Sequence, residues 1–170
     1  GLKVTRAAGA TASLELSSVN TNFLDIGANV STRIAGDQAH ISTLGNQSYQ
    51  SGVSISNGGT INCANMSTIG FCGEATPLNA TSFESFQGTI SFQKALFDDL
   101  SNPGLSVVEV KARADTGSGG AIEFFGNIGL DTSGAAAPLG GLFLKAANVS
   151  WPSSASVGVG QQVNLDEQVA

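Results

Sequence analysis

Two aspartates, Asp115 and Asp131, have the surroundings in this sequence that come closest to a catalytic motif. Each is followed by a threonine and then by small residues and glycine, and Asp-Thr-Gly is the local sequence of aspartic-protease active sites. In such sites two aspartates share one proton, because like charges about 3 Å apart cannot both ionise. The alternating residues 121–130 between them predict one strand, which would separate its ends by about 30 Å. We therefore interpret both aspartates as turn residues.

The other candidate catalytic and metal-binding groups lack suitable partners in the sequence. His40 is the only histidine, and no G-x-S-x-G element accompanies it for Ser-His-Asp chemistry. The glycine pairs 119–120 and 140–141 lack the lysine of a phosphate-binding loop. The aspartates show no EF-hand spacing, although a calcium site built from loops stays open. The sequence predicts a protein that is not an enzyme and that has no cofactor.

Cys63 and Cys72 are the only cysteines, and they lie close together in the sequence. A zinc site needs about four nitrogen or sulfur ligands, and neither a histidine nor a CxxC spacing accompanies this pair. We expect a loop-closing disulfide, with two buried thiols as the alternative. A disulfide would place the protein outside the reducing cytosol.

Five Asn-x-Ser/Thr sequons are candidate N-glycosylation sites: Asn29, Asn46, Asn65, Asn79 and Asn148. Asparagine also forms turns, so a purely structural interpretation stays open. If the sequons are used, the protein is extracellular or lies on a cell surface.

The composition excludes some partners. Charged residues make up 12% of the chain, against about 25% in a typical soluble domain, so small polar groups must cover much of the surface. The net charge is −6 and the seven Lys and Arg residues are scattered, which argues against nucleic acid as a partner. No apolar run approaches the roughly 20 residues that span a bilayer, so membrane insertion is not expected.

Alternation of apolar and polar residues dominates the chain and predicts an all-β fold. The longest alternating segment is N-terminal, and its apolar residues share one parity: Leu2, Val4, Ala8, Ala10, Ala12, Leu14 and Leu16. Further strands are predicted within 86–92, 108–112, 121–130 and 142–146. The apolar residues around 93–101 instead have helical spacing, which predicts a short helix.

These elements together predict an antiparallel β-sandwich, with a jelly roll or a partly closed barrel as variants. Residues 1–18 would form an extended N-terminal strand, and residues 19–170 the sandwich domain.

The extended N-terminal segment suggests a function. Such a segment can add a strand to the open sheet of a neighbour, and head-to-tail contacts of this kind build filaments. The leading hypothesis is a structural subunit of an extracellular, pilus-like filament, a homopolymer joined by donation of residues 2–16.

Two alternatives remain at this point. One is a surface adhesin or carbohydrate-binding module that contacts host or cell-surface glycans through loops near Tyr49 and Trp151. The other is a viral capsid or coat subunit with a jelly roll.

Overall fold

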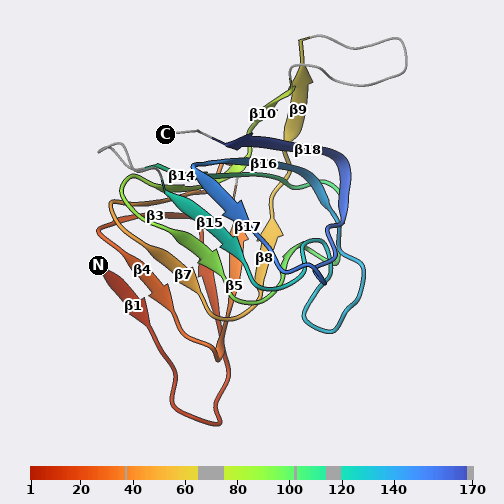
Figure 1. Ribbon diagram of the computed structural model, residues 1–170. Coiled ribbons are helices and arrows are strands. Elements are labelled where there is room, and N and C mark those ends of the chain that lie inside the picture. Colours follow the sequence, from red (N-terminus) through yellow and green to blue (C-terminus); the bar gives the residue numbers. More distant parts are fainter. Residues whose placement is uncertain (37, 65–74, 102, 114–119, 168–170) are drawn as a thin grey trace.

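Three β-sheets of parallel strands make up the body of the molecule (Figure 1). The computed structural model describes residues 1–36, 38–64, 75–101, 103–113 and 120–167. Sheet A contains β1 (Leu2–Val4), β4 (Leu24–Ile26), β7 (Gln47–Tyr49), β12 (Ile90–Phe92), β15 (Ala121–Phe124) and β17 (Asn148–Ser150). Sheet B contains β2 (Ala12–Leu16), β5 (Val30–Ala35), β8 (Val53–Ser56) and β13 (Leu96–Asp98). Sheet C contains β3 (Ser18–Thr21), β6 (His40–Thr43), β11 (Thr81–Ser85), β14 (Val107–Ala112), β16 (Leu139–Ala146) and β18 (Val159–Glu167).

The chain enters the three sheets in turn, so each strand pairs with the strands one turn earlier and one turn later. β1, β2 and β3 are the first strands of sheets A, B and C, and they pair in parallel with β4, β5 and β6. Ser18 of β3 thus lies beside His40 of β6, about 22 residues further along the chain. This cyclic order defines a parallel β-helix, a repeat architecture in which each turn contacts only its neighbours.

The predicted antiparallel sandwich is therefore wrong, and its jelly-roll variant with it, although the all-β class is confirmed. Alternation reports only that one face of a strand is buried, and it is the same for parallel and antiparallel pairing. Parallel neighbours need a connection of a dozen or more residues. Here the strands of the other two sheets form that connection.

The predicted helix at 93–101 is also wrong, because this segment contains β13, and no helix occurs among the described residues. Phe92 ends β12 in sheet A and Leu96 begins β13 in sheet B, and both are 0% exposed. The chain turns a corner between these two inward-facing side chains, which mimics the i, i+4 spacing of a helix face. Within the described part of the chain, nothing forms a helix that could cross a membrane.

The interior is an apolar column in which side chains of successive turns stack. Tyr49, Phe92 and Phe124 are aligned in sheet A, with ring centroids 5.2 and 5.3 Å apart and interplanar angles of 8°. Phe83 of β11 meets Tyr49 and Phe92 edge-on, at 5.6 and 5.3 Å. Each aromatic pair contributes about 0.5–1.5 kcal/mol beyond its burial. The Tyr49 hydroxyl donates to the Gln47 side chain at 3.0 Å, so it is not left unpaired in the core.

One antiparallel hairpin, formed by β9 (Thr60–Cys63) and β10 (Ala75–Leu78), projects from the β-helix between β8 and β11 (Figure 1). It covers part of the outer face of sheet C, where a small second core has these members: Ile61, Ala75, Ala80, Val107 and Phe143. The strands on either side of the hairpin still pair directly, β6 with β11 and β7 with β12. The insertion therefore leaves the stacking of turns intact.

The predicted continuous N-terminal strand is divided between two sheets. Leu2 and Val4 belong to β1, Ala12, Leu14 and Leu16 belong to β2, and Ala8 and Ala10 lie in the connection between them. Both strands pair within the chain itself, β1 with β4 and β2 with β5. The segment is thus built into the first turn of the β-helix.

Candidate functional site

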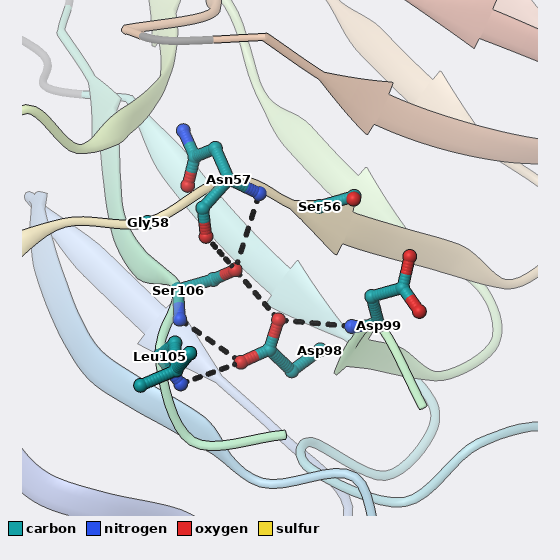
Figure 2. Close-up of a pocket in the computed structure, with 7 residues that line it drawn as sticks. All are labelled: Ser56, Asn57, Gly58, Asp98, Asp99, Leu105 and Ser106. Carbon is teal, nitrogen blue, oxygen red and sulfur yellow. Dashed lines mark hydrogen bonds between the residues drawn. The ribbon is translucent and has the colours of Figure 1, made fainter. Parts of the chain in front are cut away.

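A polar pocket of about 320 Å³ lies where strands of sheet B lead into sheet C (Figure 2). It is lined by Ser56, Asn57, Gly58, Asp98, Asp99, Leu105 and Ser106. Ser56 ends β8 and Asp98 ends β13, whereas Leu105 and Ser106 lie just before β14. The pocket thus forms at a corner of the coil, where strand ends expose backbone groups.

The Asp98 carboxylate is at the centre of the hydrogen bonds in this pocket, and the residue is 1% exposed (Figure 2). Its Oδ2 accepts from the N–H groups of Leu105 at 3.0 Å and Ser106 at 2.9 Å. Its Oδ1 accepts from the N–H of Asp99 at 2.8 Å and from the hydroxyl of Ser106 at 2.6 Å. A buried carboxylate is tolerated only when such bonds compensate its lost hydration. Asp98 therefore fixes the start of β14 against the end of β13.

Asp99 and Arg33 join a network on the outer face of sheet B. Arg33 of β5 pairs with Glu15 of β2 and, at 3.4 Å, with Asp99, and it also donates to the Ser56 hydroxyl at 2.6 Å. Hydrogen bonds from the N–H and hydroxyl of Ser101 are the main reason that the pKa of Asp99 is lowered to about 2. The hydrogen bond to Glu15 raises the pKa of Arg33. These charges tie successive turns together.

The lining of the pocket holds two carboxylates and two hydroxyl groups, but neither histidine nor cysteine. The Ser106 hydroxyl contacts a carboxylate, but no imidazole lines the pocket to activate it. His40 lies on β6, where it pairs with Glu84 at 3.4 Å. Among the described residues, no three His, Cys, Asp or Glu side chains converge as a metal site would need. The pocket is best explained as a structural junction between turns.

Asp131 is a turn residue, as predicted. Its Oδ1 accepts from the hydroxyl and N–H of Ser133, at 2.7 and 2.8 Å, and from the N–H of Ala135 at 2.8 Å. These bonds lower the pKa of Asp131, and the Ser133 hydroxyl has the largest effect. Asp115 lies outside the described residues.

The predicted single strand 121–130 is wrong. β15 ends at Phe124, and Ile128 lies in sheet B, where it bridges to Leu96 and Val157. The chain turns from sheet A to sheet B between Phe124 and Ile128. Apolar side chains point inward on both sides of this corner, so alternation alone could not show it.

The two aromatic residues considered for glycan contact have different environments. Tyr49 is 0% exposed inside the aromatic column, which excludes it from a sugar platform. Trp151 is 41% exposed and follows β17, with its ring centroid 6.2 Å from that of Phe124. Trp151 thus extends the aromatic column at its C-terminal end.

The predicted modification sites are only partly described. Four sequon asparagines are exposed: Asn29, Asn46, Asn79 and Asn148. Cys63 is the last residue of β9. Asn65 and Cys72 lie outside the described residues. The disulfide and the use of the sequons therefore stay predictions.

The first turn of the β-helix is a second candidate site, because β1, β2 and β3 are the edge strands of their sheets. In a parallel strand, the backbone groups of alternate residues face opposite neighbours. Ala12 donates its N–H to Asn29 at 3.0 Å, so the backbone of Ser13 faces away from β5. Ser17 accepts from the N–H of His40 at 3.2 Å, so the backbone of Ser18 faces away from β6. Within the described chain, these outward N–H and C=O groups have no strand beside them.

The inward side chains of this first turn are only half covered. Those that pack on the core without being fully buried include Val4, Leu14, Leu16 and Val19. Their partners one turn further are 0–3% exposed: Ile26, Thr32, Ile34 and Ile41. The end of the β-helix therefore combines open main-chain edges with accessible apolar side chains, which suits it to receive another layer of strands.

Few features of the sequence indicate the polar pocket. Asp98 and Asp99 resemble the acidic first turn of a helix, and Ser106 stands in no recognisable motif. The available signal was that Asp98 shares the parity of Leu96, which places it on the inward face at the end of a strand.

No protein-family model, curated protein or solved structure matches this chain. The architecture defines the class to which the chain can be assigned, that of parallel β-helices.

Proposed function

We propose that this protein is a structural, non-enzymatic subunit of an extracellular, pilus-like filament whose copies associate end to end. The proposal rests on the structure of the first turn. Its three strands have open edges, and their inward apolar side chains are only half covered. Open edges readily pair with strands of another chain. The low charge density and the predicted disulfide support an extracellular location.

The opposite end of the β-helix has the matching features. β17 and β18 are the edge strands of sheets A and C there, and Val157 bridges to Ile128 in sheet B. β18 belongs to sheet C, and the next sheet in the cyclic order is A, the sheet of β1. A second copy can therefore place β1 beside β17 and β3 beside β18 with all strands parallel. Such a head-to-tail contact does not close on itself, so it builds a filament.

This mode of assembly differs from the strand donation expected from the sequence. β1 and β2 pair with β4 and β5 of their own chain, so the N-terminal segment offers an edge to a neighbour and is not inserted into its core. The capsid alternative loses its basis, because a jelly roll is antiparallel.

The test removes donors at the open edge while leaving the internal ladder intact. Proline lacks the N–H group and is tolerated where a strand edge is unpaired, so Ser13→Pro with Ser18→Pro should preserve the fold. The matched control is Ser13→Ala with Ser18→Ala, which keeps both N–H groups. Electron microscopy and sedimentation velocity would measure assembly, and circular dichroism would verify folding.

We expect filaments from the wild-type and alanine proteins and folded monomers from the proline protein. A wild-type protein that stays monomeric at high concentration contradicts the proposal. So does a dimer that grows no further, or a proline variant that still polymerises.

A further inference from the structure

A shallow groove of about 580 Å³ lies on the outer face of sheet C and shares no lining residue with the polar pocket. Its lining comes from β3, β6 and the residue that follows β11: Ser18, Val19, Asn20, His40, Ser42 and Phe86. We propose that this groove binds a neutral saccharide. The inference does not depend on filament assembly.

The register of sheet C builds a regular array of polar side chains in the groove. Ile41 and Phe83 are 0% exposed and point into the core, so the residues beside them point outward. Asn20 and Ser42 are register partners on neighbouring strands, which lie about 4.8 Å apart. Hydroxyl and amide groups therefore stand side by side across the groove.

The hydroxyl of Ser42 is the strongest sign that the groove receives a ligand. Ser42 is 9% exposed and lines the groove, yet its hydroxyl has no hydrogen-bond partner in the described part of the chain. Its oxygen is not among the fully buried side-chain atoms without a partner in the described residues, so it opens into the groove and is available to a ligand. The exposed side chains of Ser18 and Asn20 likewise have no partner among the described residues. These groups can both donate and accept, as the hydroxyl groups of a sugar require.

Phe86 supplies an apolar surface at one side of the groove. The residue is 36% exposed, and its main chain is held in place because its N–H donates to the carbonyl of Thr43 at 3.0 Å. The next residue, Gln87, donates its N–H to Leu44 at 2.7 Å. An exposed aromatic ring beside neutral polar groups can pack against the C–H face of a sugar ring while the polar groups bind its hydroxyls.

The charges around the groove favour a neutral ligand. Neither Lys nor Arg lines it, so phosphate and sulfate groups would find no cationic partner. The nearby Glu84 carboxylate is largely covered and pairs with His40 at 3.4 Å. Phe86 is the only large apolar side chain of the lining that faces outward, because Val19 points toward the core, and one such side chain is too little for a hydrophobic ligand. A peptide strand would pair with the edge of the sheet and not with its face.

The test uses saturation-transfer NMR on the whole chain with four neutral probes: maltotriose, cellotriose, triacetylchitotriose and lactose. A sulfated heparin disaccharide serves as the anionic probe. Ser42→Ala and Phe86→Ala remove the two main features of the groove. Ser42→Ala deletes a hydroxyl that has no partner among the described residues, so that variant should fold even if Phe86→Ala does not. Ser82→Ala, on the same face but outside the lining, and Phe125→Ala, an exposed phenylalanine elsewhere, are the controls.

We expect at least one neutral probe to bind, with affinity reduced about tenfold or more by Ser42→Ala and by Phe86→Ala, and unchanged in both controls. The inference is overturned if no neutral probe binds. It is also overturned if the sulfated probe binds better, or if the groove variants bind as well as the controls.

Discussion

Replacing Asp98 by asparagine tests whether the polar pocket is a structural junction. The carboxylate accepts four hydrogen bonds, two on each oxygen, whereas an amide has only one acceptor oxygen. At least one donor among the N–H groups of Asp99, Leu105 and Ser106 then loses its acceptor. An unsatisfied buried donor costs about 1–3 kcal/mol, and replacing charge-assisted bonds by neutral ones adds about 1 kcal/mol. We expect Asp98→Asn to lower the free energy of unfolding by about 2–4 kcal/mol.

Urea unfolding at neutral pH, followed by Trp151 fluorescence and circular dichroism, would measure this loss. Asp131→Asn is the matched control, because Asp131 accepts three comparable hydrogen bonds but lies in an exposed turn. All three bonds end on Oδ1, so the amide oxygen of asparagine can still accept them, and the control should lose much less stability. A loss below about 1 kcal/mol for Asp98→Asn, or one no larger than the control shows, would refute the reasoning.

Two further predictions concern titration. The pKa of Asp99 is lowered to about 2 from 3.8, so the unfolded state binds more protons between these values and stability falls as pH drops through this range. In Asp99→Asn, the urea midpoint of unfolding should therefore fall less steeply at acid pH than in the wild-type protein. An equally steep fall would contradict the role of Asp99. Burial raises the pKa of Tyr49 well above 10, and it is the only tyrosine. Spectroscopic titration should therefore show tyrosinate only when the protein unfolds in alkali. Ionisation of Tyr49 near pH 10 in a protein that is still folded by circular dichroism would contradict the burial of this side chain.

The strands of sheet C show what could be predicted from the sequence. Val108 and Val110 in β14, and Leu142 and Leu144 in β16, alternate with outward residues and were expected on inward faces, where the structure places them. Alternation reports burial, which is a local property of the chain. The partner of each strand is a non-local property. Consecutive strands often pair with each other, but in this fold they lie in different sheets.

The sequence contains a glycine that recurs at the same place in successive turns, but insertions make the spacing between these glycines irregular. Gly45, Gly88 and Gly120 each stand two residues before aligned positions of sheet A. A Cβ atom on Gly120 would lie 2.8 Å from the carbonyl oxygen of Gly88, so the stacked corners leave no room for a side chain. The intervals between these glycines are unequal, because the hairpin and other loops lengthen individual turns. A search for a fixed period would therefore miss them.

The polar pocket could not be predicted from the sequence, because its contacts join residues that are separated along the chain. The donors to Asp98 come from Leu105 and Ser106, across a corner of the coil. The pairing of Asp99 with Arg33 joins residues that are 66 positions apart. Such contacts depend on the stacking of turns, and without that stacking an acidic pair resembles any solvated helix start.

The parallel stacking of turns also determines how the molecule responds to force. Because hydrogen bonds between turns run along the axis of the β-helix, a pull between its two ends would load them in tension and open them one turn at a time. A regular turn of about 22 residues would release about 75 Å of extended chain. The turn that contains the β9–β10 hairpin would release nearly twice as much. The molecule would therefore lengthen in discrete steps, each turn absorbing work before the next one yields.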